Sequence, residues 1–397
     1  MNNWILFFSL LATAMGQSVV FALMPALGRE SGLTELQIAS IISFSALVFA
    51  LGSTFWGKRA IKWGRKNILI IGLSGYSIGT FVFASVFYLG INKQIAPDLF
   101  YVLLFTARIL QSCIMSATPT SALSYAISTC STAQILPTIS RLTSANNLGQ
   151  MLGPMLVGFL VIFGLLIPLY TITIFTILAL LLVWRFLPVD KPITASNNIE
   201  KPNQFIPIKK NESTNSFIPF AAIAASLFCA MAMMQQSLGF FIIDALKQNA
   251  INAASMLGIG AMIVAVCSLI TQLFLLQRIK ANQLTLLKIG LFTLIIGHLT
   301  IATCHDINEI YLGMALLGFG MGFSYPTAAS MATGRCSIDQ QQTAVGLISA
   351  APAIGFISGP LIAAFLYQKN INFPFFAATS LMIIVFISSL QLREKHN

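Results

Sequence analysis

Long apolar stretches of close to 20 residues recur along almost the whole chain. A bilayer core about 30 Å thick is crossed by about 20 helical residues, since each adds about 1.5 Å. In lipid a helix satisfies its own backbone hydrogen bonds, so the sequence predicts an all-α membrane protein. We expect twelve crossing helices, approximately at 4–27, 36–57, 67–90, 98–124, 139–163, 165–187, 217–244, 252–276, 284–303, 308–333, 341–367 and 372–392.

The two halves of the chain share short motifs at corresponding places. The motifs, each in its two copies, are Gly149-xxx-Gly153-Pro154 and Gly355-xxx-Gly359-Pro360, and Gln17-Ser18-x-x-Phe21 and Gln236-Ser237-x-x-Phe240. Repeated bundles are typical of transporters, in which two similar units rock about a site between them. We therefore expect two pseudo-symmetric six-helix bundles, at 1–187 and 217–397, joined by a cytoplasmic linker at 188–216 that is rich in Pro, Asn, Ser and Lys.

The net charge of +11 indicates topology rather than nucleic-acid binding. Charged residues make up only 8% of the chain, against about 25% in soluble proteins. Most of the basic residues gather in alternate loops, at 58–66, 185–210 and 278–288. Because cytoplasmic loops carry an excess of Lys and Arg, we expect the chain in the cell (inner) membrane with both termini in the cytoplasm.

The sequence predicts no metal, no cofactor and no enzymatic activity. Its six cysteines form no Cys-x-x-Cys pair, and its three histidines are too few for a ligand cluster. No P-loop motif is present, which disfavours direct use of ATP. No His/Asp/Glu or Ser/His grouping lies within any predicted helix.

The loop after the second predicted helix carries a known hallmark. Its glycines and cations are Gly57, Lys58, Arg59, Lys62, Gly64, Arg65 and Lys66. This loop resembles the Gly-x-x-x-Asp-Arg/Lys-x-Gly-Arg-Arg/Lys motif of the major facilitator superfamily, and the stretch around it resembles the drug:proton antiporter branch with its tetracycline-efflux-type proteins. The resemblance implies a gating role for Gly57, Lys62, Gly64 and Arg65. The chain departs from the motif at Ile61, where the family has an acidic residue.

The Gly-xxx-Gly-Pro sequence at 149–154 resembles the antiporter motif of the same family, whose meaning there is export. Residues four apart share one helical face, so the two glycines form a groove for a neighbouring backbone. Pro154 and Pro360 each remove a backbone donor and favour a bend. The second copy at 355–360 leaves close packing alone as the alternative explanation.

Arg108 lies about 15 Å along the fourth predicted helix, at about 1.5 Å per residue. An arginine at that depth costs about 2.5–3.5 kcal/mol on insertion scales, so a function is expected. Arg108 and Gln111 resemble the family's Arg-x-x-Gln motif, whose arginine is linked to proton transfer or to holding anionic substrate groups. The alternative is an arginine that binds backbone carbonyls and stiffens the bundle.

Acidic residues are absent from the middle of the predicted helices. Asp244, at the outer end of the seventh helix, comes closest. We assign it, with Arg108, as a candidate coupling residue, and the alternative is a pairing with Lys247. His298 in the ninth helix is expected to be a hydrogen-bonded structural residue.

In the family, helices 1, 4, 7 and 10 surround a central cavity. The resemblance therefore implies a substrate-binding set on these helices, to which helix 5 adds three amides. The set is Gln17, Phe21, Arg108, Gln111, Met115, Asn146, Asn147, Gln150, Gln235, Gln236, Phe240, Phe323 and Tyr325. Such a pocket suits a sizeable amphipathic or partly anionic molecule.

The leading hypothesis is a monomeric secondary transporter that exports small amphipathic drugs or metabolites in exchange for protons. Its partners are then a small-molecule substrate, protons and membrane lipid, with no nucleic acid. The alternatives are a siderophore or nutrient transporter that works by symport, and a membrane receptor that does not transport.

Overall fold

The computed structural model describes residues 2–130, 134–189, 217–279, 281–334 and 338–392. Within these ranges every regular element is helical and no strand occurs, which confirms the prediction of an all-α chain. The predicted linker at 188–216 lies outside the described residues except for its first two positions.

The first half of the chain forms a group of long helices and one short 3-10 turn. Their bounds are α1 Asn2–Ser31, α2 Glu35–Trp63, α3 Arg65–Ile91, α4 Pro97–Met115, α5 Ala117–Ser128, α6 Ile135–Leu160, η2 Val161–Phe163 and α7 Ile167–Phe186.

The second half forms a similar group, with a π-helical turn after α9. Its bounds are α8 Ile218–Asp244, α9 Ala250–Ile270, η3 Thr271–Leu275, α10 Leu276–Arg278, α11 Gln283–Ala302, α12 Ile307–Gly334, α13 Ile338–Lys369 and α14 Phe373–Leu390.

Eleven helical segments in the described residues are long and apolar enough to cross a membrane. The helix α12 has the length, with 28 residues, but five of them are glycines, which lower its apolar character. Together these segments account for the twelve predicted crossings.

The fourth crossing is broken into α4 and α5, where the sequence predicted one helix. Pro119 is the third residue of α5 and has no N–H to donate to the carbonyl of Met115, four residues earlier. The regular hydrogen bonding of the helix therefore stops at Ser116. This break separates the segment that carries Arg108 from the segment that follows it.

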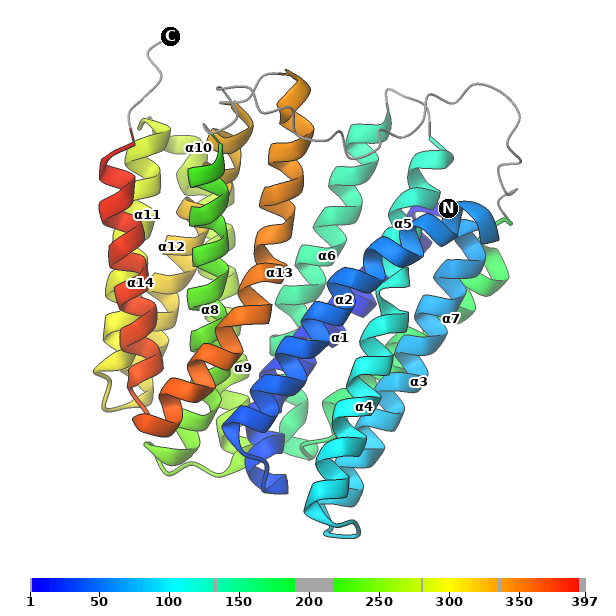
Figure 1. Cartoon of the computed structure of the whole chain (residues 1–397), viewed down its shortest axis with the longest axis horizontal. Coiled ribbons are helices and arrows are strands. Elements are labelled where there is room, and N and C mark those ends of the chain that lie inside the picture. Colours follow the sequence, from blue (N-terminus) through cyan, green and yellow to red (C-terminus); the bar gives the residue numbers. More distant parts are fainter. Residues whose placement is uncertain (1, 131–133, 190–216, 280, 335–337, 393–397) are drawn as a thin grey trace.

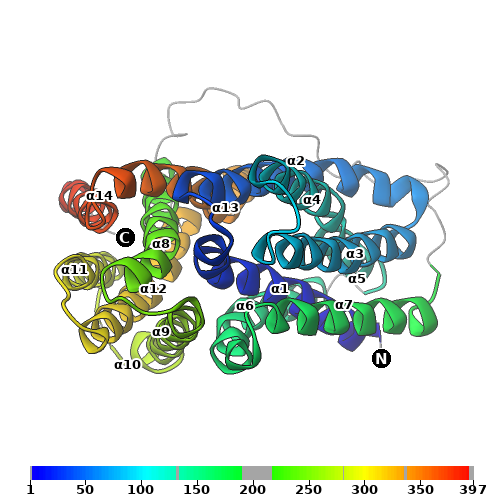
Figure 2. The same ribbon diagram turned by 90° about the horizontal axis from the view of Figure 1, so that it is seen from below.

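The helix α1 begins and α14 ends at the same end of the bundle, which we call the termini end (Figure 1). The opposite end, which contains the turn at Gly32 and the end of α8, is the distal end. Seen from the distal end, α1–α7 and α8–α14 occupy opposite sides of the molecule (Figure 2). The two sides meet where α2 packs on α13 and α6 packs on α9.

The repeated glycine motif makes the same contact in each half. A Cβ built on Gly149 would lie 2.4 Å from the Leu11 carbonyl oxygen, and one on Gly153 would lie 2.5 Å from that of Met15, both on α1. In the second half, a Cβ on Gly359 would lie 2.8 Å from the Cys229 carbonyl oxygen of α8. The motif therefore lets α6 approach α1, and α13 approach α8, at backbone distance.

The contact between α6 and α9 also lacks side chains at its centre. A Cβ on Gly258 would lie 2.6 Å from the Pro154 carbonyl oxygen and 2.7 Å from the Gly158 nitrogen. Beside it, the Ser255 hydroxyl donates a hydrogen bond of 3.1 Å to the Gly158 carbonyl oxygen. The two halves thus touch backbone to backbone close to the distal end.

Candidate functional site

A cavity of about 610 Å³ lies between the two halves. Its walls come from α1, α2, α4, α5 and α6 on one side, and from α8, α9, α12 and α13 on the other. Polar, aromatic and aliphatic side chains together line these walls. The cavity is large enough for a drug-sized molecule, because such ligands occupy sites of about 300–1,000 Å³.

Nine of the predicted substrate-binding residues line this central cavity. They are Gln17, Phe21, Arg108, Met115, Asn146, Asn147, Gln150, Gln235 and Tyr325, and Pro154 of the glycine motif joins them.

The other four predicted substrate-binding residues lie outside the lining. Gln111 is buried behind Arg108, where its side chain packs on Gly79. Gln236, Phe240 and Phe323 are buried outside the cavity lining, with 4%, 1% and 7% of their surfaces exposed. Gln236 follows Gln235 by one residue, which turns its side chain about 100° around α8 and away from the cavity.

Sequence reasoning missed several lining residues. Ser45 and Phe49 come from α2, Phe356 comes from α13, and Ser112 and Phe228 lie on helices that were already considered. The family resemblance pointed to helices 1, 4, 5, 7 and 10, so α2 and α13 were not among the predicted lining helices. These two helices cross the molecule at a slant, so their middle residues reach the centre (Figure 1).

The cavity opens toward the termini end. On α6, the lining residues Thr143, Asn147 and Gln150 are exposed although they face the centre of the molecule. Toward the distal end the interface is closed, because every residue from 22 to 28 of α1 and from 236 to 242 of α8 is buried. The structure is therefore that of a cleft with one entrance.

Two aromatic rings form part of the distal floor of this cleft. Phe21 of α1 and Phe356 of α13 stack with their centroids 5.0 Å apart and their planes 15° apart. Below them a Cβ on Gly239 would lie 2.6 Å from the Cβ of Pro25, so α8 and α1 are in close contact. The floor thus joins the two halves by packing alone.

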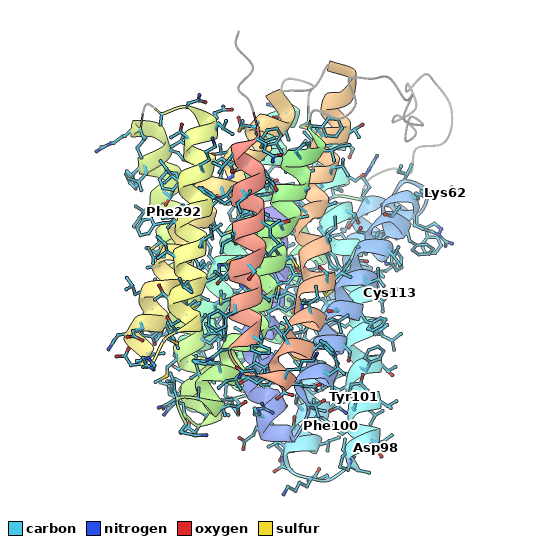
Figure 3. All side chains as sticks on the ribbon, turned by 60° about the vertical axis from the view of Figure 1, so that its left-hand side comes forward. Lys62, Asp98, Phe100, Tyr101, Cys113 and Phe292 are labelled. Atoms are coloured by element: carbon cyan, nitrogen blue, oxygen red, sulfur yellow. The ribbon has the colours of Figure 1, made fainter. Side chains whose placement is uncertain are left out.

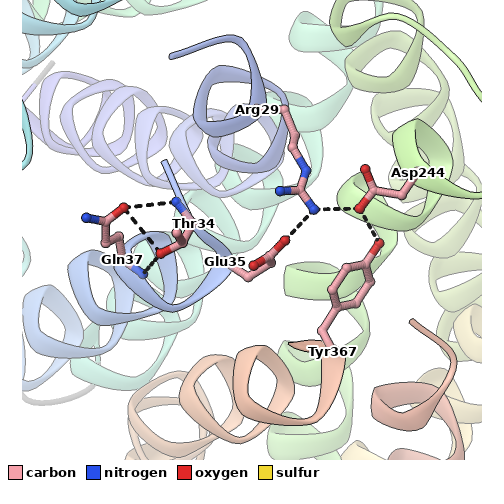
Figure 4. A network of polar contacts seen from close by, with 6 residues as sticks. All are labelled: Arg29, Thr34, Glu35, Gln37, Asp244 and Tyr367. Carbon is pink, nitrogen blue, oxygen red and sulfur yellow. Dashed lines mark hydrogen bonds and ion pairs between the residues drawn. The ribbon is translucent and has the colours of Figure 1, made fainter. Parts of the chain in front are cut away.

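A group of four polar residues closes the distal end further, and we call it the distal cluster: Arg29, Glu35, Asp244 and Tyr367 (Figure 4). Arg29 Nη2 donates to Asp244 Oδ2 at 2.5 Å and also binds Glu35 Oε1. The Tyr367 hydroxyl donates to Asp244 Oδ2 at 2.8 Å. The guanidinium lies 4.8 Å from the centroid of the Phe240 ring. Charges from α1 and α2 are thereby tied to α8 and α13.

Sequence reasoning offered Lys247 as a partner for Asp244, and the structure gives a different one. Lys247 is exposed and makes no ion pair with a described residue, whereas Asp244 forms an ion pair with Arg29. The sequence did contain a hint of this pairing, since Arg29 lies at the distal end of α1 and Asp244 at the distal end of α8, the first helix of each half.

Arg108 is buried, with 2% of its surface exposed, and it lines the central cavity. Its Nη1 donates to Gln111 Oε1 at 2.7 Å, and Gln111 Nε2 in turn donates to Thr80 Oγ1 at 2.7 Å. The Phe83 ring lies 5.7 Å from the guanidinium carbon. The arginine is therefore held in place by an amide and a ring, and no described carboxylate lines the cavity beside it.

His298 lies on α11 and does not line the cavity. It is fully buried, and its Nδ1 is 2.9 Å from the carbonyl oxygen of Leu294 in the same helix. The geometry is that of a structural hydrogen bond. Among the residues that the structure describes, no three His, Cys, Asp or Glu side chains come together as a metal site.

The hallmark loop lies at the termini end, between α2 and α3. Gly64 joins the two helices with a φ of 87°, a conformation that residues with a side chain rarely adopt. Arg65 Nε donates to Ser124 Oγ of α5 at 2.9 Å. Lys66 Nζ binds the carbonyl oxygens of Trp184, at 3.1 Å, and Leu187, where α7 ends. These cations therefore link α3 to α5 and to the end of α7.

The remaining motif positions of this loop are less enclosed. Lys62 points away from the bundle (Figure 3), and a Cβ on Gly57 would meet no atom within 4 Å. Ile61, which replaces the family's acidic residue, is 41% exposed.

Comparisons with known proteins identify the family. The model of the Major Facilitator Superfamily matches residues 6–336 and 285–397. Multidrug resistance protein 1 of Bacillus subtilis (strain 168) is 24% identical over 96% of this chain and 93% of its own length. Multidrug resistance protein 2 of the same organism is 20% identical over 99% of this chain and 95% of its own.

Solved structures share the fold. A bacterial homologue of the lysosomal transporter Spinster, in an inward-facing and unoccupied conformation, superposes with a TM-score of 0.77 at 14% identity and covers 98% of this chain and 96% of its own. A mutant of the nucleoside transporter NupG gives a TM-score of 0.75 at 14% identity, with 98% and 99% covered. Because the family model spans nearly the whole sequence, the chain belongs to the Major Facilitator Superfamily and is a multi-pass membrane transporter, not an enzyme.

Proposed function

We propose that this protein is a secondary exporter of small amphipathic molecules, driven by protons and working by alternating access. The observation that carries the proposal is the central cavity, which lies between two similar groups of helices, opens at one end and is closed at the other. A transporter of this kind exposes its site to one side of the membrane at a time.

The distribution of charge supports a cytoplasmic location for the termini end, in the inner membrane of the cell. Lys58, Arg59, Lys62, Arg65 and Lys66 lie at that end, and Arg185 and Arg278 do so too. The distal end carries fewer basic residues. By the positive-inside rule the cavity then faces the cytoplasm, from which an exporter loads its substrate.

The two six-helix units, at 1–187 and 217–397, would act as the moving bodies, joined by the linker at 188–216. The predicted binding residues that line the cavity are proposed to contact the substrate, and Arg108 and Asp244 to couple transport to protons. The name multidrug resistance protein of the curated relatives supports export of amphipathic compounds.

The direction of transport is tested in everted membrane vesicles made from cells that overproduce the protein. The vesicle interior is acidified, and a panel of fluorescent amphipathic compounds with anionic, neutral and cationic head groups is added. An exporter accumulates its substrate inside these vesicles. Uptake by symport gives no accumulation, and binding without accumulation identifies a receptor.

The matched control is Arg108→Ala, which we expect to insert normally and to abolish accumulation. Insertion is checked by the amount of folded protein in the membrane. Full activity of this variant would remove Arg108 from the site.

A further inference from the structure

Arg108 is the sole charged residue among the described side chains that line the central cavity. All other lining residues are apolar, aromatic, hydroxyl-bearing or amide-bearing. The acidic residues whose side chains are described all belong to the distal end: Glu30, Glu35, Asp98, Asp244, Asp306 and Glu309. Figure 3 shows one of them, Asp98, at that end of the molecule. Among the described residues, Arg108 therefore gives the cavity a positive charge that no carboxylate on its walls balances.

The guanidinium of Arg108 has more N–H donors than the described neighbours have acceptors to pair with them. An arginine side chain carries five N–H donors, and the described residues offer one acceptor, Gln111 Oε1 at 2.7 Å. Gln111 is itself fixed by its bond to Thr80. The amide thus orients the arginine and leaves its charge in place. A buried cation without a counter-ion is unfavourable, so an anion that enters the cavity gains from meeting it.

The surroundings of Arg108 define the rest of the ligand. The stacked rings of Phe21 and Phe356 present an apolar surface at the distal floor, and Met115 and Phe49 add apolar surface elsewhere on the walls. The amides of Gln17 and Gln235 supply neutral donors and acceptors. A planar carboxylate matches a guanidinium with two parallel hydrogen bonds. A cationic ligand finds no carboxylate on the described walls and meets the charge of Arg108.

We propose that the cavity binds an amphipathic organic anion whose carboxylate pairs with Arg108, and that it discriminates against organic cations. This inference rests on the proposed function for the idea that the ligand is cargo. The binding preference itself depends neither on the direction of transport nor on protons.

The test is equilibrium binding to the purified full-length protein in detergent, measured by titration calorimetry with empty micelles as the blank. The three probes share one ring system: 1-naphthoate, 1-naphthamide and 1-naphthylmethylammonium. We expect the naphthoate to bind at least tenfold more tightly than the amide, and the ammonium to bind most weakly. Absence of naphthoate binding, or an ammonium that binds as tightly as the naphthoate, would overturn the proposal.

Two variants assign the preference to Arg108. Arg108→Gln removes the charge and should reduce naphthoate binding to the level of the amide. Ser112→Asp keeps the arginine and places a carboxylate one helical turn away on the same wall, so it should also abolish the preference. The control is Arg141→Gln, which removes an exposed arginine that lies 5.6 Å from the Trp4 ring, outside the cavity lining.

The outcomes separate this inference from the proposed function. A preference for naphthoate that persists in both Arg108→Gln and Ser112→Asp overturns the anion site, whatever the transport assay shows. A preference that disappears in both variants upholds the site, even where everted vesicles accumulate nothing and the export proposal fails.

Discussion

Arg29 and Asp244 join α1 to α8 across the interface between the halves, with Nη2 and Oδ2 only 2.5 Å apart. Glu35 competes for the same guanidinium from α2, within the first half. When Asp244 is replaced by a neutral residue, Arg29 therefore retains a partner, and the ion pair that is lost is the one between the halves. The side chains of Arg29 and Asp244 are 28% and 30% exposed, so solvent weakens their attraction.

Asp244→Asn should open the distal end. The substitution removes the charge and keeps an oxygen acceptor, which costs about 1 kcal/mol for a pair this exposed and shifts the equilibrium about fivefold. The measurement is labelling of Ala22→Cys, in a background without other cysteines, by a membrane-impermeant maleimide added from the distal side. Ala22 lines the cavity and is 7% exposed. The control Glu35→Gln leaves the contact between the halves in place, and equal labelling of both variants would contradict the prediction.

Gly153→Val should destabilise the protein and slow transport. The new Cβ would lie 2.0 Å from Ser18 Oγ and 2.5 Å from the Met15 carbonyl oxygen, so α6 has to move away from α1. Overpacking of this kind costs about 1–3 kcal/mol. The measurement is the thermal unfolding of the purified protein together with its transport rate.

The second copy of the motif provides a parallel test. Gly359→Val should act in the same way, because its Cβ meets Ala232 and the Cys229 carbonyl oxygen. Gly346→Val is the matched control in the same helix, since its Cβ meets no atom within 4 Å. An equal loss of stability in Gly346→Val would attribute the effect to helix propensity rather than to packing.

Two glycines of the hallmark loop should respond to alanine with opposite signs. Gly64→Ala forces a side chain onto a φ of 87° and should cost about 1–3 kcal/mol. Gly57 lies within α2 with open space around it, so Gly57→Ala should add about 0.5–1 kcal/mol of stability. Thermal unfolding of the two variants in one detergent decides the matter. Two shifts of the same sign would refute the prediction.

Lys66→Met should destabilise the termini end of the first half. Lys66 is 8% exposed, and its removal leaves the carbonyl oxygens of Trp184 and Leu187 without their cation. Losing a partner of buried groups costs about 1–3 kcal/mol. The measurement is the midpoint of thermal unfolding. Lys62→Met removes an exposed lysine from the same loop and should leave the midpoint within about one degree of the wild type. A similar fall in both variants would argue against a specific role for Lys66.

The helical architecture was open to prediction because it depends on local pattern. Each run of about 20 apolar residues has to form a helix in lipid, whatever surrounds it. The repeated glycines also predicted a close contact between helices, although only the structure identifies α1 and α8 as the partner helices. The break at Ser116 was missed, because Pro119 was counted within one long apolar run.

The arrangement of the site depended on information that the sequence holds only weakly. Gln235 lines the cavity and Gln236 does not, because only one face of α8 meets the cavity. Two adjacent glutamines in a sequence do not indicate which of them lies on that face. The partner of Asp244 lies 215 residues away in the chain, so a nearby lysine was the easier candidate. The contributions of α2 and α13 follow from their slant, which is set by packing between the halves.

The close crossing of Gly158 with Gly258 is a suitable pivot for the proposed rocking of the two halves. Neither glycine carries a side chain, so apart from the Ser255 hydrogen bond the two backbones meet there without interlocking side chains. The lever arms differ greatly, since α6 runs roughly 35 Å from this point to its start at Ile135, at about 1.5 Å per residue, and only a few ångströms to its finish. If the halves rock about this point as proposed, a small tilt sweeps the termini end of α6 through a wide arc while its distal end moves only slightly.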